Sequence, residues 1–236
     1  TDTQGRLFDV DLETADVVER SLVFSQPVST PTVSADGKFL GLTSLGAQDR
    51  TAAVWDLESN TELFRVPQKR PENGGGLLSI IDFTHDMTAI VKSGGSLSQW
   101  DLRTGKKVLP EFPDQPYGIE LVSFAPDRKT WLLVLADSDV YFVDLASRKS
   151  IGILQGMKEV VVAVAYSQDG RTLATATQSG PVQLWHVSTR QPLCELPRID
   201  GKILSLWFTA DGKRLFAAVE RTSGDREIVV WDTRED

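Results

Sequence analysis

The sequence is poor in the residue types from which many catalytic and metal sites are built. Its 236 residues include a single cysteine, Cys194, and two histidines, His85 and His186. One cysteine excludes an intrachain disulfide, and two histidines far apart in the chain do not form a zinc site unless carboxylates join them. We therefore predict neither a disulfide-stabilised secreted domain nor a metal site.

Long apolar runs and an excess of positive charge are also absent. No apolar run reaches the roughly 18 residues of a membrane-spanning helix, and the first ten residues lack the charged and then apolar order of a signal peptide. The chain has 33 acidic and 25 basic residues, and its formal net charge of -8 repels the phosphate backbone. These features predict a cytoplasmic protein that binds neither membranes nor nucleic acid.

The common catalytic motifs are missing as well. There is no Gly-x-Ser-x-Gly elbow, no phosphate loop ending in Gly-Lys-Ser/Thr and no His-Glu-x-x-His. The glycines at 74–76 precede a strand-like run and so offer no helix N-terminus to a phosphate, and the Asp-Ser-Asp at 137–139 lacks the later ligands of a calcium loop. Cys194 lies in a predicted outer strand, where an inert thiol is expected. We predict no catalytic residue and no cofactor.

Internal repetition is the strongest feature that is present. Six segments end alike, and four of them contain a tryptophan directly before the last aligned position: Trp55, Trp100, Trp185 and Trp231. The aligned column itself reads Asp11, Asp56, Asp101, Asp144, His186 and Asp232, with spacings of 42 to 46 residues. A period of this length is typical of a solenoid or a propeller, not of a single irregular domain.

Each repeat has the same internal order. An alternating β-branched run meets a turn containing Asp36, Asp86, Asp127, Asp169 or Asp211, and two further runs follow, the second of which ends at the Trp-Asp position. Asp-Gly between alternating runs is a strong hairpin signal, because glycine accepts positive φ. A fourth short strand is predicted after each Trp-Asp segment, for example at 61–66, 106–109 and 191–196. No helical periodicity occurs, so the pattern predicts four-stranded antiparallel propeller blades.

The repeats resemble those of the WD-repeat β-propeller family, over essentially the whole chain. Family members usually form a hydrogen-bonded tetrad from a Gly-His histidine, a Ser/Thr, the tryptophan and an aspartate seven residues before the Trp-Asp aspartate. Here that aspartate occurs only as Asp49, Asp137 and Asp225, and the Gly-His histidine is missing throughout. The resemblance therefore implies stability that rests on apolar packing between sheets, and a structural role for His186 in place of an aspartate.

The strand pattern also divides the chain into blades. We predict a single propeller segment, 1–236, that consists of a partial blade at 1–25, full blades at 26–67, 77–110, 118–155 and 160–197, and a blade without its last strand at 202–236. The first and last blades together do not supply a whole set of four strands, and closed propellers avoid open edges. We therefore expect an incomplete segment of a larger ring of seven or more blades.

Three other residues depart from the repeat pattern. His85 lies in a predicted hairpin turn, where an exposed side chain is expected. Asp82 occupies a position that is Thr, Ser, Ala or Trp elsewhere, and we expect a cation or water to pair with it, the alternative being a functional channel. Trp207 is large where its counterparts are small, which predicts that it fills a wider gap between blades.

Function in a repeated scaffold is expected in the loops that differ between repeats. The loops at 65–76, 109–118, 44–50 and 220–226 are long, and in a propeller they emerge on the same face. They carry the predicted partner-binding residues Arg50, Lys69, Arg70, Phe112, Tyr117, Arg221 and Arg226. The alternative is that these side chains merely solvate the surface.

The sequence as a whole favours a non-catalytic scaffold. Its expected partner is another protein or another domain of the same polypeptide, bound through the loop face. The spelling of the repeats resembles that of bacterial WD-repeat proteins, which implies the sensor or interaction region of a larger bacterial signalling protein. The alternative is an enzymatic propeller, a hydrolase or a cofactor-binding protein, with polar groups around a central channel.

Overall fold

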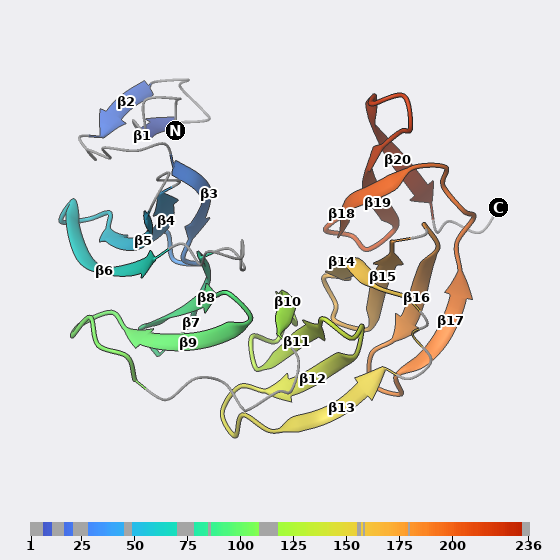
Figure 1. The fold of residues 1–236 in the computed structure, drawn as a ribbon, viewed down its shortest axis with the longest axis horizontal. Helices are drawn as coiled ribbons and strands as arrows, with labels where there is room; N and C mark the ends of the chain where they lie inside the picture. Colours follow the sequence, from blue (N-terminus) through green and yellow to red (C-terminus); the bar gives the residue numbers. More distant parts are fainter. Residues whose placement is uncertain are drawn as a thin grey trace. The chain divides into compact units, whose positions relative to one another are not determined.

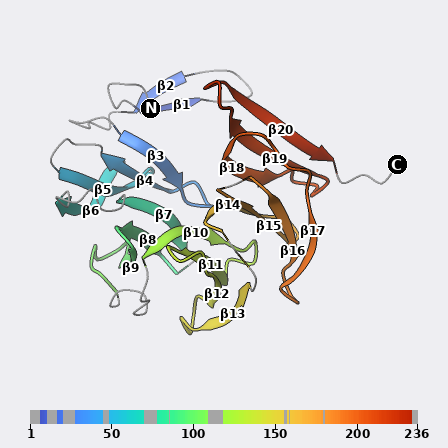
Figure 2. The same cartoon turned by 45° about the vertical axis from the view of Figure 1, so that its right-hand side comes forward.

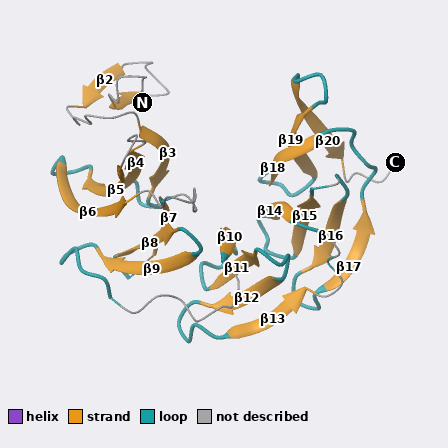
Figure 3. Ribbon diagram, viewed as in Figure 1, coloured by secondary structure: helices purple, strands orange, loops and turns teal. Residues whose placement is uncertain are grey.

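The chain is built from strands and turns. The computed structural model describes residues 7–10, 17–20, 28–44, 49–69, 78–84, 86–108, 118–154, 157, 159–178 and 180–232. Figure 3 shows strands and loops in these residues and no helix, so none of them lies in a helix that could cross a membrane. The predicted all-β fold class is confirmed.

The chain divides into two compact units, Thr1–Gln115 and Pro116–Asp236. In the first unit, β1 pairs with β2, β3–β6 form a four-stranded sheet, and β7–β9 form a three-stranded sheet, all in antiparallel chain order (Figure 1). Their bounds are β1 (Leu7–Val10), β2 (Val17–Arg20), β3 (Val28–Val33), β4 (Phe39–Ser44), β5 (Asp49–Asp56), β6 (Thr61–Lys69), β7 (Ser79–Thr84), β8 (Thr88–Ser93) and β9 (Ser96–Asp101).

The second unit contains two four-stranded sheets and one three-stranded sheet, again antiparallel and in chain order. Figure 2 shows β14–β17 following one another in this way. The bounds are β10 (Ile119–Phe124), β11 (Thr130–Leu135), β12 (Val140–Asp144), β13 (Ser150–Leu154), β14 (Val161–Tyr166), β15 (Thr172–Thr177), β16 (Val182–His186), β17 (Gln191–Glu195), β18 (Lys202–Phe208), β19 (Arg214–Glu220) and β20 (Arg226–Asp232). The four-stranded antiparallel blade is therefore the unit of the fold, as predicted.

One predicted strand is wrong. Residues 106–108, the described part of the strand predicted at 106–109, form an isolated bridge between Trp100 and Lys107 and do not add a regular strand to the sheet β7–β9. The backbone N–H of Val108 donates to Gln99 O at 2.8 Å next to that bridge. Two lysines at 106 and 107 offer no alternating apolar face, so the segment lacks the side-chain pattern that favours a regular strand.

The first hairpin of each blade is fixed by a repeated polar turn. In the turn after β14, Ser167 Oγ donates to Asp169 at 2.7 Å, and Asp169 accepts the backbone N–H of Arg171 at 3.0 Å. Gly170 supplies the positive φ, 69°, that the turn requires. The hydrogen bond from Ser167 is the main reason that the pKa of Asp169 lies below its ordinary value. The same arrangement recurs at Ser34 and Asp36 and at Thr209 and Asp211.

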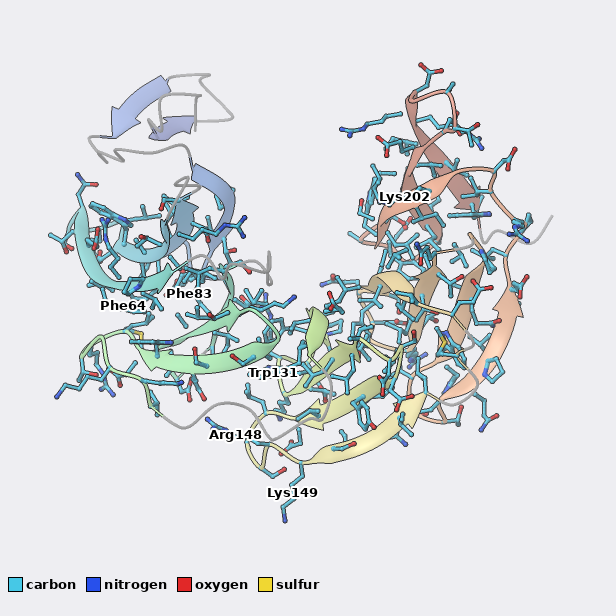
Figure 4. All side chains as sticks on the ribbon, in the orientation of Figure 1. Phe64, Phe83, Trp131, Arg148, Lys149 and Lys202 are labelled. Carbon is cyan, nitrogen blue, oxygen red and sulfur yellow. The ribbon has the colours of Figure 1, made fainter. Side chains whose placement is uncertain are left out.

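The cores lie between successive sheets of each unit. In the second unit, Leu132 and Phe142 of one sheet pack with Leu173 and Trp185 of the next, and all four are buried. In the first unit, Phe64 of β6 and Phe83 of β7, both labelled in Figure 4, belong to one buried cluster. Full burial of one such side chain is worth about 1.5–3 kcal/mol. Face-to-face apolar packing therefore holds neighbouring blades together.

Candidate interaction surface

The aligned acidic column caps the turn between the third and fourth strands. Asp56 Oδ1 accepts the backbone N–H groups of Glu58 and Ser59 at 2.8 and 2.9 Å. Asp101 and Asp144 accept backbone N–H groups in the equivalent turns. Asp232 instead accepts from Arg214 Nε at 3.3 Å, and Asp11 lies outside the described residues. The column is thus an architectural position in the blades where the structure describes the turn.

His186 takes the place of the carboxylate in this column. Its Nδ1 accepts the backbone N–H of Thr189 at 3.4 Å and lies 3.2 Å from both Ser188 Oγ and Thr189 Oγ1. A ring nitrogen therefore performs the capping that a carboxylate oxygen performs in the neighbouring blades. His186 is occupied by its own turn, and these contacts give it a structural function.

The repeat tryptophans differ in their hydrogen bonds. Trp185 Nε1 donates to Thr175 Oγ1 at 2.9 Å, and both residues are buried. Trp100 Nε1 instead donates to Ser98 Oγ on its own strand, at 2.9 Å. The other described blades carry apolar residues at the position of Thr175, namely Leu42, Val91, Leu133 and Ala217. The tryptophan–threonine part of the family tetrad thus occurs in one described sheet.

Two of the predicted tetrad aspartates are used locally. Asp137 Oδ1 accepts the backbone N–H of Asp139 at 3.1 Å, and Asp225 Oδ2 accepts from Ser223 Oγ at 2.7 Å. Both contacts lie within the turn that joins the second and third strands. These aspartates therefore shape their own turns.

The structure places four of the seven predicted partner-binding residues. Arg50 is half-buried at the start of β5, and Lys69 ends the paired strand β6, its side chain lying outside the described part. Arg221 and Arg226 flank the turn between β19 and β20. Three lie outside the described residues: Arg70, Phe112 and Tyr117. Within each unit, two of the predicted cations thus come close to each other in the fold.

The cations of the β19–β20 hairpin are compensated by acidic neighbours. Arg221 forms an ion pair with Glu227 and donates to the backbone carbonyl of Asp200. Arg226 pairs with Glu220 at 3.2 Å. The four side chains carry no net charge together, and exposed pairs of this kind contribute about 1 kcal/mol or less. The hairpin therefore presents both positive and negative side chains. Arg221 also joins it, through its hydrogen bond to Asp200, to the loop before β18.

Sequence reasoning missed a pocket beside the first strands of the second unit. The pocket has a volume of about 450 Å³. We call it the inner-strand pocket; it is lined by Glu120, Leu121, Ala136, Val160, Val161, Val162, Lys202, Ile203 and Leu204. These residues come from the start of β10, the end of β11, and the starts of β14 and β18. The pocket therefore lies at the end of the strands where the variable loops leave the sheets.

A repeated β-bulge creates the wall of the pocket. The pairing of each first strand with the second shifts by one residue, and the residue left out is Glu120 in β10, Val162 in β14 and Leu204 in β18. All three are seven residues before the turn aspartate of their blade, and all three line the pocket. A bulge takes one residue out of the ladder and redirects its side chain. The three positions share no residue type, so only the break in alternation could have identified them.

The rim of the pocket is held by backbone contacts. Ala136 N donates to Gly118 O, and Gln178 N donates to Val160 O, both at 2.9 Å. Gly201, with φ at 141°, precedes β18, and a Cβ there would lie 2.8 Å from the backbone oxygen of Glu220. Glycine is therefore required at this close approach, and the loop is fixed directly beside the pocket.

The lining of the pocket is apolar except for one acidic and one basic side chain. Val160 is 43% exposed and Leu204 38% exposed, although both are large apolar side chains. Among the lining residues, Glu120 supplies the one acidic group and Lys202, labelled in Figure 4, the one basic group. The lining contains no histidine, cysteine or hydroxyl side chain, and no three His, Cys, Asp or Glu residues of the described part could hold a metal ion. The geometry suits binding of an apolar group.

The other unusual residues lie apart from the pocket lining. Trp207 is 38% exposed and stacks on Phe216 at 5.7 Å, on the face of β18–β20 that also exposes Ile228 and Val230. Trp207 thus packs within its own sheet instead of filling a gap between two described sheets. Asp82 is 9% exposed, and its Oδ1 accepts the backbone N–H of Phe83 at 2.7 Å. Cys194 is exposed on β17, and His85 lies outside the described residues.

Comparison with known proteins gives distant similarity to WD-repeat proteins. No family model matches the chain. It is 24% identical to the WD repeat-containing protein SL1-17 of Schistosoma mansoni over 193 residues, 80% of the chain and 61% of the relative. It is 24% identical to Periodic tryptophan protein 2 of Arabidopsis thaliana over 213 residues, 88% of the chain and 22% of the relative. The small ribosomal subunit protein RACK1 of Drosophila melanogaster is 31% identical over 156 residues, 59% of the chain and 45% of the relative. The chain spans about three fifths of the first relative and about a fifth of the second.

Proposed function

We propose that the chain is a WD-repeat module that binds another protein, or another domain of its own polypeptide, without catalysing a reaction. The single observation that carries the proposal is the inner-strand pocket, a concave and exposed apolar surface on a rigid sheet framework. Exposed apolar patches with a polar rim are typical of interaction sites. Similarity to WD-repeat proteins supports the same reading of the fold.

The enzymatic alternative needs convergent catalytic groups, and the pocket favours binding instead. Its lining combines one carboxylate and one ammonium group with seven apolar residues, which gives no nucleophile beside a base. The formal charge of -8 supports a partner other than nucleic acid. A cytoplasmic location and a place in a larger signalling protein are parts of the same proposal, and they rest on composition and on the spelling of the repeats.

Site-specific photo-cross-linking tests the proposal. A benzophenone amino acid is introduced at Val160, on the pocket wall, or at Lys149, in the turn at the opposite end of the strands (Figure 4), in cells that express the native polypeptide. We expect discrete adducts from Val160 and none from Lys149, with mass spectrometry identifying either a second protein or a remote segment of the same polypeptide. Absence of adducts from Val160, or the same adducts from both positions, contradicts the proposal.

A further inference from the structure

We propose that the inner-strand pocket binds an extended peptide segment in which an apolar side chain is followed by an acidic residue. This inference rests on the proposed function. The apolar side chain enters between the bulged residues Val162 and Leu204, and the carboxylate pairs with Lys202.

The wall is built for an apolar side chain. Val162 and Leu204 are released from ladder pairing by their bulges, and Leu204 and the neighbouring Val160 are exposed in the lining. Exposed apolar surface in a concavity is costly to hydrate and is released from water when an apolar group covers it. The bulge residues occupy equivalent positions in neighbouring sheets, so together they form one surface, and one side chain from a partner can contact both.

The charge on the wall selects an acidic neighbour. Lys202 lies directly opposite Glu220 in the β18–β19 register, but Glu220 forms its ion pair with Arg226. Among the described residues, Lys202 has no ion-pair partner, and its side chain is exposed at the edge of the pocket. Its ammonium group is therefore available to a carboxylate of the ligand.

The size of the site fits a side chain and its neighbours. A volume of about 450 Å³ falls near the lower end of the roughly 300–1,000 Å³ that ligand pockets occupy. Val160, Lys202 and Leu204 of the lining are exposed, so a chain can run across the site while one side chain is buried. A site that encloses a small molecule would instead bury these side chains.

Methyl NMR with short synthetic peptides tests this inference. The probe is acetyl-Gly-Ser-Leu-Asp-Ser-Gly-amide, added to protein labelled at valine and leucine methyl groups. We expect shifts centred on Val162 and Leu204. Replacing the probe's leucine with serine removes the buried side chain and weakens binding at least about tenfold. Replacing its aspartate with lysine weakens binding about two- to fivefold, as is typical of an exposed ion pair.

Variants of the protein provide the matched comparison. Lys202→Glu is expected to reverse the preference between the aspartate and lysine probes, whereas Lys213→Glu, in the β18–β19 turn of the same sheet and outside the pocket lining, leaves the preference unchanged. Leu204→Asp, at an exposed position, is expected to abolish the methyl shifts of Val162 while the remaining spectrum stays that of the folded protein.

Several outcomes overturn the inference. It fails if the leucine–aspartate probe leaves Val162 and Leu204 unshifted, if the serine probe binds equally well, or if hexanoate alone binds as tightly, since a small carboxylate would then be the ligand. Adducts from Val160 together with inactive peptides leave the protein-interaction function standing and refute this peptide chemistry. Loss of both the adducts and the peptide shifts refutes both proposals.

Discussion

Two junctions between neighbouring sheets, one in each unit, make the same contact with exchanged residues. In the first unit, Gly105 in the turn after β9 lies against Phe64 of β6, and a Cβ on Gly105 would lie 2.9 Å from that of Phe64. In the second unit the equivalent turn residue is Arg190 and the equivalent strand residue is Gly152. A Cβ on Gly152 would lie 2.0 Å from Arg190 Nε. The large residue and the glycine have changed sides.

The large residue of each junction also makes a different kind of interaction. Phe64 stacks on Trp100 of the following sheet at 5.7 Å with an interplanar angle of 12°. Arg190 instead donates from Nη2 to Ile151 O at 2.6 Å and places its guanidinium carbon 5.5 Å from the ring centroid of Phe142. A position in the repeat is therefore defined by the contact that its side chain makes, and its residue type can change when the residue that it contacts changes.

The largest loss of stability is expected when only one of the two exchanged residues in the second unit is replaced. Gly152→Phe copies the residue of the first unit into a place that Arg190 already fills, and overpacking should lower the free energy of unfolding by about 3 kcal/mol. The double variant Gly152→Phe with Arg190→Gly restores the arrangement of the first unit and should recover most of the loss. Thermal unfolding of both variants and of Arg190→Gly completes the cycle. A double variant as unstable as Gly152→Phe would show that the two positions are not coupled.

A smaller loss of stability is expected when the hydrogen bond between Trp185 and Thr175, which distinguishes the sheet β14–β17, is removed. Thr175→Val leaves the buried indole N–H of Trp185 without its acceptor, which should cost about 2 kcal/mol in denaturant unfolding. Thr177→Val is the matched control on the same strand, because Thr177 Oγ1 is buried and makes no hydrogen bond. The control should be as stable as the parent or more so. Equal losses for the two variants would mean that side-chain shape, not the hydrogen bond, is responsible.

The smallest loss of stability is expected from a change in the polar hairpin turns, and its size depends on pH. Ser167→Ala removes the hydroxyl that lowers the pKa of Asp169, and the turn 125–130, which carries Ala125 at the equivalent position, shows that the fold accepts alanine there. A carboxyl whose folded pKa lies below its unfolded value of about 3.9 stabilises the protein above that pH, and the contribution is lost as the pH falls through the folded pKa. The melting temperatures of parent and variant should therefore differ by a few degrees at pH 7 and by less at pH 3. The same difference at both pH values would contradict this assignment.

The sequence predicted the features that repeat by residue type. Asp-Gly turns and Trp-Asp strand ends are chemical signals, and they located the hairpins. His186, which stands in the same column as the aspartates, accepts a backbone N–H of its own turn. The strand expected at 106–109 was wrong, since Val108 is its one apolar residue among the described positions and a single bridge forms instead.

The candidate site was not predictable in the same way. The inner-strand pocket depends on pairing register, and Glu120, Val162 and Leu204 share a register position without sharing a residue type. The compensation of Arg221 and Arg226 depends on which residues face each other across β19 and β20. A list of basic loop residues contains neither kind of information, because both arise only when the strands pair.

The repeated bulge separates the proposed binding surface from the backbone pairing that forms the sheets. A residue that is left out of the ladder can change without removing a backbone pair, so a substitution at an exposed bulge such as Leu204 alters the proposed binding surface at little cost to folding. Each duplication of the repeat then adds one more freely variable position next to the existing ones. Blade duplication followed by change at a single codon per blade is thus a short evolutionary route to a new binding preference on an unchanged scaffold.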